Sequence, residues 1–217
     1  MIKLNLDVKK EGPLHVLCLG AHSDDIEIGC GGTILRLIHE YPQVIFHWVV
    51  FSARGVRRLE AEHASEMFAG RQRLASLVLK EFPDGFMPYM GAEVKAAFED
   101  LKETVSPDLI FTHQSHDAHQ DHRLLCELTW NTFRNHFILE YEIPKYDGDF
   151  GRPSVFFPVD REQCQTKIRN LMEAFGSQRS KHWFQESTFE GLMRLRGMEC
   201  NAPSGYAEAF YCRKAVL

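Results

Sequence analysis

Residues 15–32 read HVLCLGAHSDDIEIGCGG, an apolar run that passes directly into a histidine and two carboxylates. An apolar run bounded by glycine predicts a buried strand of a parallel sheet over residues 15–21. In open α/β sheets, ligands bind at the carboxyl ends of such strands. His22, Asp24 and Asp25 fall at that end, and burying these groups is unfavourable without a cation. The segment therefore predicts an α/β fold with a ligand site next to its first strand.

The rest of the chain alternates between strand patterns and helix patterns. This alternation predicts an α/β, Rossmann-like fold, with a mostly parallel sheet covered by helices on both faces. The 217 residues contain no repeat and no linker, so we expect a single domain over residues 1–217. The expected strands are 15–21, 44–52, 77–82, 109–112, 138–143, 154–159 and 208–216, and the expected helices are 29–40, 60–68, 93–105, 121–137, 163–175 and 189–196.

Composition excludes several classes of partner. The net charge of −5 gives no reason to expect nucleic acid or an anionic membrane. No apolar run reaches the roughly 20 residues of a membrane span, and the mixed, charged residues 1–13 do not resemble a signal peptide. The six cysteines are scattered and include no C-x-x-C pair, which favours reduced thiols and a cytoplasmic location. The sequence leaves both a monomer and a homo-oligomer open.

The first polar cluster has metal-ligand spacing. His22 and Asp25 are three residues apart and can converge on one point, whereas Asp24 must point elsewhere and is free for proton transfer. A phosphate-binding loop is the first alternative, but the spacing G-x-G-x-x-G is absent and the acidic residues would repel phosphate. The second alternative is an acidic helix start, in which Asp24, Asp25 and Glu27 only complement the helix dipole.

A second polar cluster follows the strand expected at residues 109–112. Two clusters at the ends of parallel strands can face each other across one crevice, so a histidine of the second could complete a metal site with two histidines and one aspartate. Another histidine could stabilise negative charge, and Asp117 or Asp121 could orient a histidine. A solvated polar loop is the alternative, above all for His113 and His116. The cluster consists of His113, His116, Asp117, His119, Asp121 and His122.

These segments resemble the PIG-L/LmbE-like family of zinc-dependent N-deacetylases. That family carries A-H-P-D-D-x-E-x-G-x-G-G after its first strand, and residues 21–32 depart from it only at Ser23. Proline would have fixed φ there, so Ser23 could loosen the turn without abolishing metal binding. The family's H-x-D-H motif matches residues 119–122. Weaker similarities are R-x-x-E-A at residues 57–61, P-D-G at residues 83–85 and A-E-A-F at residues 207–210.

The resemblance implies a catalytic zinc site with an open fourth position, or an iron(II) site of the same kind. It implies an aspartate general base and a protonated histidine that, oriented by a neighbouring aspartate, holds the oxyanion formed when water attacks an amide. By position, the resemblance assigns metal binding to His22, Asp25 and His122, the base to Asp24, oxyanion binding to His119 with Asp121, and substrate contact to Arg57.

The implied substrate is a small N-acetylated sugar or glycoconjugate containing N-acetylglucosamine. The aromatic residues Tyr146, Phe150, Trp183 and Phe184 could stack on a sugar ring, although core packing is the favoured interpretation, and His182 is a weak candidate for a substrate contact. Two other functions remain open. The first is an amide hydrolase that acts on a non-sugar or thiol conjugate. The second is a non-catalytic α/β ligand-binding protein, against which the intact polar clusters argue.

Overall fold

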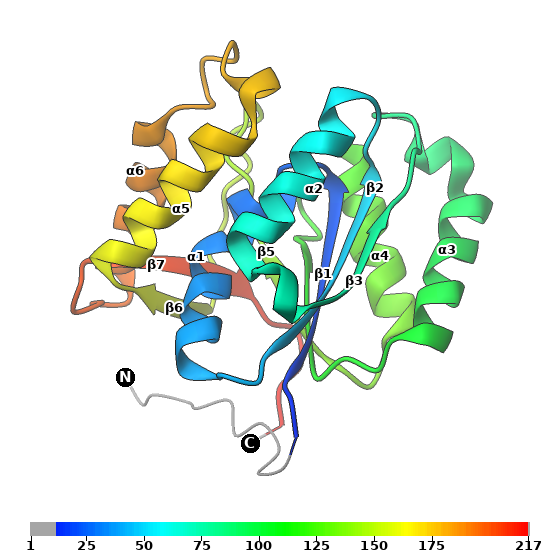
Figure 1. Ribbon diagram of the computed structural model, residues 1–217, viewed down its shortest axis with the longest axis horizontal. Coiled ribbons are helices and arrows are strands. Elements are labelled where there is room, and N and C mark those ends of the chain that lie inside the picture. Colours follow the sequence, from blue (N-terminus) through cyan, green and yellow to red (C-terminus); the bar gives the residue numbers. More distant parts are fainter. Residues whose placement is uncertain (1–11, 217) are drawn as a thin grey trace.

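The computed structural model describes residues 12–216, which form one α/β domain around a seven-stranded sheet (Figure 1). The predicted fold class is confirmed, while the expectations for residues 1–11 and 217 lie outside the described residues. In chain order the elements are β1 (His15–His22), α1 (Asp25–Glu40), β2 (Ile45–Ser52), α2 (Val56–Ala69), η1 (Arg71–Arg73), β3 (Leu74–Leu79), η2 (Met87–Met90), α3 (Gly91–Thr104), β4 (Leu109–His113), α4 (Gln120–Thr132), β5 (Phe137–Tyr141), β6 (Val155–Val159), α5 (Arg161–Ala174), η3 (Gly176–Gln178), α6 (Glu186–Glu199) and β7 (Tyr206–Tyr211).

The sheet is mostly parallel and reverses its winding beside β1. Its strand order is β3-β2-β1-β4-β5-β7-β6, in which β1 to β5 run parallel and β7 runs antiparallel to both of its neighbours. The chain moves outward from β1 through β2 and β3 and then returns to place β4 on the other side of β1. The carboxyl ends of β1 and β4 therefore flank the crevice in which open α/β sheets bind ligands.

Two helical layers cover the sheet. Alternate side chains of a strand point to opposite faces, and on β1 Val16 joins the core under α1, α2 and α5, whereas Leu17 joins the core under α3 and α4. Figure 1 shows α3 and α4 together on one side of the sheet and the other helices across from them. Helix α6 packs on β7 and α5. Within residues 12–216, no helix is long and apolar enough to cross a membrane.

Helix α1 begins four residues earlier than the predicted start at residue 29. Its first residue is Asp25, and it contains a break at Cys30, where φ is −141° and ψ is 16°. The glycines of residues 29–32 indicate a helix start, but they lie inside the helix, where they permit close approach of neighbouring side chains. The segment that begins at Asp25 is therefore a helical turn and not a loop.

Other element boundaries also differ from the prediction, among them those of β3, α4 and the last strand. Strand β3 ends at Leu79, before the predicted residue 82, because the chain continues beside β2 only through irregular bonds such as Phe82 N–H to the Phe51 carbonyl. Helix α4 stops at Thr132 instead of residue 137, since the residues from Phe137 onward are needed to pair with β4. The last strand covers residues 206–211 and not 208–216.

Candidate metal centre

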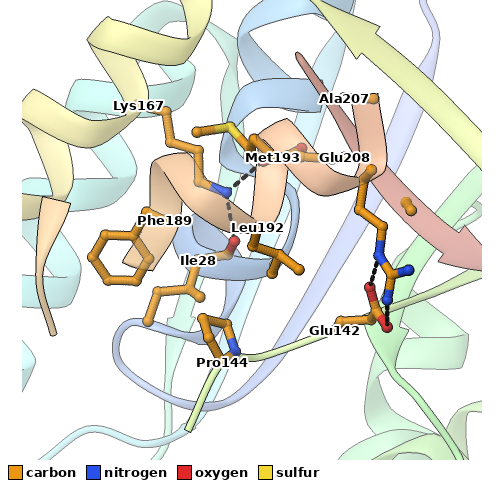
Figure 2. A pocket seen from close by; sticks show the side chains of 12 residues that line it. Ile28, Glu142, Pro144, Lys167, Phe189, Leu192, Met193, Ala207 and Glu208 are labelled. Carbon is orange, nitrogen blue, oxygen red and sulfur yellow. Dashed lines mark hydrogen bonds and ion pairs between the residues drawn. The ribbon is translucent and has the colours of Figure 1, made fainter. Parts of the chain in front are cut away.

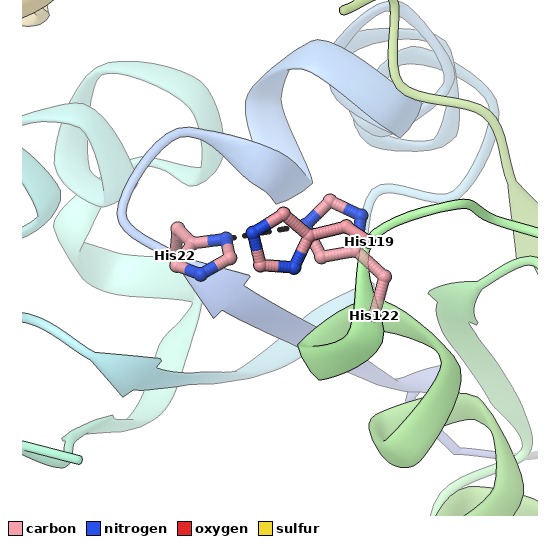
Figure 3. A group of neighbouring side chains, drawn as sticks. All are labelled: His22, His119 and His122. Atoms are coloured by element: carbon pink, nitrogen blue, oxygen red, sulfur yellow. Dashed lines mark hydrogen bonds between the residues drawn. The ribbon is translucent and has the colours of Figure 1, made fainter. Parts of the chain in front are cut away.

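Two strand-to-helix junctions bring the two polar clusters together. Asp24 is the N-cap residue of α1, and His119 is the N-cap residue of α4, where its Nδ1 accepts a hydrogen bond from the Asp121 backbone N–H at 3.3 Å. Figure 3 shows His22 at the end of β1 facing His119 and His122 at the start of α4. The prediction that both clusters share one crevice agrees with this placement.

His22, Asp25 and His122 present three donor atoms to one point. The His22 Nδ1 lies 3.1 Å from the His122 Nε2 and 3.3 Å from the Asp25 Oδ2, and the His122 Nε2 lies 3.4 Å from the same Asp25 oxygen. Ligand atoms of a tetrahedral zinc site with bonds of about 2.0–2.2 Å are separated by about 3.3–3.6 Å. The three atoms therefore fit one face of a tetrahedral metal site.

The remaining nitrogen of each of these histidines faces a carboxylate. The His22 Nε2 lies 3.0 Å from Asp84 and 3.3 Å from Asp121, and the His122 Nδ1 lies 3.0 Å from Asp117. Metal-ligating histidines usually donate their other ring N–H to a carboxylate, which directs the unprotonated nitrogen to the metal. Both histidines thus have the surroundings of metal ligands.

His113 also lies at this cluster, and the atoms of Asp25, His113 and His122 form one of several groups that could hold a metal. The His113 Nε2 is 3.2 Å from the Asp25 carboxylate, but it also accepts the backbone N–H of Ala21 at 3.0 Å. That hydrogen bond uses the lone pair that a metal would need. Burial lowers the pKa of His113 to about 4, which keeps the ring neutral. We therefore favour His22 over His113 as a ligand.

The buried Asp25 is an ionised carboxylate. Burial by itself would raise its pKa, but the neighbouring His122 and His22 hold the pKa well below its usual range. Its Oδ2 also accepts the His22 backbone N–H at 2.6 Å, which fixes the carboxylate against the end of β1. An ionised carboxylate beside two histidine nitrogens is a donor set suited to zinc and to iron(II).

Asp117 supports His122 and is itself held by a lysine that the sequence gave no reason to select. The Lys145 ammonium lies 3.1 Å from Asp117 and 2.6 Å from Asp149, and its side chain is only 9% exposed. Burial would raise the pKa of Asp117, but His122 and Lys145 keep it far below its usual value. The expectation that Asp117 or Asp121 orients a histidine fits both Asp117 with His122 and Asp121 with His22.

Asp121 lies in a different place from the one that the resemblance implies. Its carboxylate accepts the backbone N–H groups of Gly85 at 2.7 Å and Met87 at 3.2 Å, and it faces the His22 ring. Only its backbone N–H contacts the ring of His119. The Asp121 side chain therefore fixes His22 and the turn at residues 83–87, and does not orient His119 as expected.

His119 is directed into the site as a hydrogen-bond donor. Its Nδ1 accepts from the Asp121 backbone, so in the neutral ring the proton is on Nε2, which lies 3.9 Å from Asp84. Burial, together with His122 and His22, lowers the pKa of His119 from its usual value. The lowered pKa favours the neutral form of this ring, in which Nε2–H is the donor.

Arg57 contacts the expected base. Its Nη2 lies 2.5 Å from the Asp24 Oδ1, and its Nη1 lies 3.1 Å from Glu60. Glu60 accepts both the backbone N–H and the hydroxyl of Ser177, each at 2.7 Å, which ties α2 to η3. The R-x-x-E-A similarity contains Arg57 and Glu60, but no sequence signal indicated that Ser177 would join them.

The other residues singled out from the sequence have varied surroundings. Ser23 is buried, and its hydroxyl reaches the Ser52 carbonyl at 3.5 Å. His116 is exposed, and His182 is an exposed residue whose ring contacts Tyr146. Of the four aromatic candidates, Phe184 belongs to the core and Trp183 is partly buried against it, as the packing interpretation predicts, whereas Tyr146 and Phe150 are 65% and 45% exposed.

Comparison with protein families and curated relatives gives consistent matches. The family model PIG-L, described as GlcNAc-PI de-N-acetylase, matches residues 17–133. Escherichia coli YaiS, named an uncharacterized deacetylase, is 27% identical over 167 residues, which are 72% of this chain and 88% of that protein. The diacetylchitobiose deacetylase of Thermococcus kodakarensis is 29% identical over 132 residues, which are 54% of this chain but only 46% of that protein.

Solved structures share the fold at low sequence identity. The N,N'-diacetylchitobiose deacetylase of Pyrococcus horikoshii, complexed with an inhibitor, superposes with a TM-score of 0.66 at 20% identity, over 91% of this chain and 83% of that one. GalB of Pseudomonas putida, a 4-carboxy-2-hydroxymuconate hydratase, superposes with a TM-score of 0.72 at 16% identity, over 94% and 98%. One fold thus carries two reaction types, and the fold alone does not specify the reaction.

Proposed function

Because the chain belongs to the PIG-L family and is accordingly a hydrolytic N-deacetylase, we propose that it removes the acetyl group from an N-acetylglucosamine-type sugar conjugate. The observation that carries the proposal is the triangle of donor atoms from His22, Asp25 and His122. Asp24 directly precedes Asp25 in the chain and is the N-cap residue of α1. A metal site with three protein ligands leaves one position for substrate, which is the arrangement of catalytic sites.

We propose zinc as the metal, held by His22, Asp25 and His122, with iron(II) as the alternative that the same ligand set accepts. When bound, such a metal acts as a Lewis acid that polarises a carbonyl oxygen and makes water more acidic. The carboxylates of Asp84, Asp121 and Asp117 fix the two histidine rings, so the chain holds its ligands in place before the metal arrives.

Asp24 is proposed to move the proton. Asp24 is buried, and its Oδ1 accepts a hydrogen bond from Arg57. Within residues 12–216, no group donates a hydrogen bond to its Oδ2. The Oδ2 is therefore available to take a proton from the attacking water and to pass it to the leaving amine. General base catalysis by a positioned carboxylate contributes about 10²–10⁴-fold to a rate.

His119 is proposed to stabilise the negative oxygen that forms on the acetyl carbon. Its neutral ring carries a proton on Nε2, which can donate a hydrogen bond to that oxygen as charge develops. A preorganised donor of this kind contributes about 10²–10³-fold in other enzymes. His119 therefore acts as a donor without first having to bind a proton.

The sugar assignment rests on the family description, on the name of the Thermococcus relative and on polar groups at the site. Asp84, 74% exposed, lies beside His22, and the partly exposed Arg57 lies beside Asp24, so carboxylate and guanidinium groups flank the donor triangle. Such groups hydrogen-bond sugar hydroxyls readily. All six cysteines are free thiols, which supports the cytoplasmic location expected from the sequence.

The test is a measurement of acetate release by zinc-loaded protein from a panel of amides. The panel contains N-acetylglucosamine, N,N'-diacetylchitobiose and an N-acetylglucosaminyl inositol, with an N-acetyl amino acid as the non-sugar member. Asp24→Asn is the control, since it should keep the metal and lose most turnover. Acetate from the amino acid alone would replace the sugar proposal by the non-sugar amide hydrolase. A metal-loaded protein that hydrolyses none of the amides would contradict the proposed function.

A further inference from the structure

The helical turn that carries Asp24 and Asp25 is separated from the rest of α1 by the break at Cys30. The short first segment ends at Gly29, where a Cβ atom would lie 2.2 Å from the Tyr141 ring. The orientation of this turn is therefore not set by the long second segment of α1 alone. Other parts of the chain must hold it.

A buried ion pair spans the break from both sides. The Lys167 ammonium donates to the Ile28 carbonyl at 2.5 Å, and the Glu208 carboxylate accepts the backbone N–H groups of Gly32 at 2.8 Å and Thr33 at 2.6 Å. Lys167 and Glu208 are themselves 2.6 Å apart. In Figure 2 the Lys167 side chain extends to the Ile28 carbonyl and to Glu208.

The ion pair binds the backbone N–H and carbonyl groups that would bond to each other in an unbroken helix. In an α-helix the N–H of each residue bonds to the carbonyl four residues earlier, so Gly32 would bond to Ile28. Here the Gly32 N–H is bound by Glu208 and the Ile28 carbonyl by Lys167. The ion pair thus bridges the two segments of α1 through side chains from α5 and β7.

Stability by itself does not account for this arrangement. Lys167 and Glu208 are 3% and 5% exposed, and desolvation of two charges offsets most of their attraction. Glycine at position 32 admits the carboxylate, because a Cβ there would lie only 3.0 Å from the Glu208 Oε1. Lys167 and Glu208 instead form hydrogen bonds to backbone groups on the two sides of the break. These bonds define the geometry of the chain at the break.

We propose that Lys167 and Glu208 are positioning residues that hold the first turn of α1, and with it Asp25 and Asp24, in the geometry needed for metal binding and proton transfer. This inference rests on the proposed function, since it assigns Asp25 to the metal. It gives a role to the A-E-A-F segment at residues 207–210, which lies outside the matched family region of residues 17–133.

A second buried ion pair offers a matched control. Arg196 binds the Glu142 carboxylate through two hydrogen bonds of 2.9 Å and 2.7 Å, and both pairs line the same cavity of about 20 Å³, room for roughly one water. Figure 2 shows Glu142 apart from Lys167 and Glu208 among the residues that line this cavity. Among residues 12–216, no hydrogen bond of Glu142 reaches α1, so Glu142→Gln removes a comparable buried charge without touching the break.

The experiment compares Glu208→Gln, Lys167→Met and Glu142→Gln with the wild-type protein. Affinity for Zn²⁺ is measured on metal-free protein by competition with a chromophoric chelator, and hydrogen exchange is measured for peptides that cover residues 24–33. Glu208→Gln and Lys167→Met should weaken zinc binding about 10–100-fold and lower kcat with little change in KM, as loss of outer-shell support does. Lys167→Arg, which keeps the charge and the donors, should recover part of the affinity.

In Glu208→Gln and in Lys167→Met, hydrogen exchange should accelerate in residues 24–33, while the central strands stay protected. Glu142→Gln should lower the melting temperature and leave the zinc affinity within about twofold of the wild-type value. A change of this size is smaller than the change that loss of a ligand contact would cause. If Glu208→Gln does not fold, Lys167→Met supplies the same measurement.

Two results would overturn the inference. The first is a folded Glu208→Gln or Lys167→Met variant that has wild-type zinc affinity and unchanged hydrogen exchange. The second is a loss of zinc affinity in Glu142→Gln equal to the loss in these variants. Either result leaves the proposed function intact. A wild-type protein that does not bind zinc or iron(II) would instead overturn the proposed function together with the inference. Metal binding by the wild-type protein is therefore measured before any variant is compared.

Discussion

The Asp24 carboxylate is bound by the Arg57 guanidinium at 2.5 Å, from Oδ1 to Nη2. The resemblance to the deacetylase family assigns Arg57 to the substrate, but its guanidinium is joined to the proposed base and to Glu60. Arg57 also lies over the Phe175 ring, 5.6 Å from its centroid, which further restricts its position. Arg57 therefore contributes to the orientation of Asp24, whatever contact it makes with substrate.

Arg57→Ala should lower kcat about tenfold to a hundredfold, because a charge-assisted hydrogen bond is worth roughly 1.5–3 kcal/mol. Metal content should not change. Steady-state kinetics and elemental analysis on one sample separate these effects. Arg58→Ala is the matched control, since Arg58 pairs with Glu62 and Glu81 at the surface. A rise in KM alone, with kcat unchanged, would return Arg57 to a purely substrate-binding role.

His22→Ala should lose most of the bound metal, because the variant removes one corner of the donor triangle. His113→Gln should retain the metal, since the His113 Nε2 is already occupied by the Ala21 N–H. His116→Ala, at an exposed position, is the control. Metal content per chain after dialysis against a weak chelator is the measurement. Loss of metal in His113→Gln with retention in His22→Ala would exchange the two assignments.

Gly29→Ala should destabilise the protein by about 1–3 kcal/mol, the range for overpacking in a core. The added Cβ would overlap the Tyr141 ring, whose hydroxyl is bonded to the Leu19 carbonyl at 2.6 Å and cannot move freely. Gly191→Ala on α6 meets nothing within 4 Å and should be neutral or stabilising by up to about 1 kcal/mol. Urea unfolding measures both. Equal stability of the two variants would show that Tyr141 yields.

His47 should make folding stability depend on pH. Burial and then the neighbouring His15, 3.2 Å away, lower the pKa of His47 below its usual value of 6.5. Between the lowered and the usual pKa the unfolded chain binds a proton that the folded chain does not. Stability should therefore fall as pH decreases through about 6.5, and the fall ends once the pH passes below the folded-state pKa.

The measurement is urea unfolding of metal-free protein at about pH 7.5 and about pH 5.5. His47→Gln should show a smaller loss of unfolding free energy over this range than wild type. His63→Gln, at an exposed histidine of α2, should behave like wild type. An identical pH dependence in wild type and His47→Gln would mean that other groups account for it.

Local sequence determined much of the architecture. The apolar run at residues 15–21 and the helical spacing of Val94, Phe98 and Leu101 predicted elements that the structure contains, with these helix residues buried. Such patterns are local because a strand or a helix buries one face of its own residues. The strand-to-helix alternation likewise sufficed for the fold class, and the spacing of His22 to Asp25 and of His119 to His122 pointed to the candidate site.

Contacts between distant segments were decided only by the tertiary structure. The pairs Lys145 with Asp117, Arg57 with Asp24 and Lys167 with Glu208 join residues 28, 33 and 41 positions apart, and local sequence patterns carry no record of such partners. The start of α1 at Asp25 belongs with them, because side chains from α5 and β7 bind the groups left by its break. The spacing of ligands within one turn can be read from the sequence. The charged side chains that orient these ligands lie on distant segments, and only the packing of the whole fold brings them to the site.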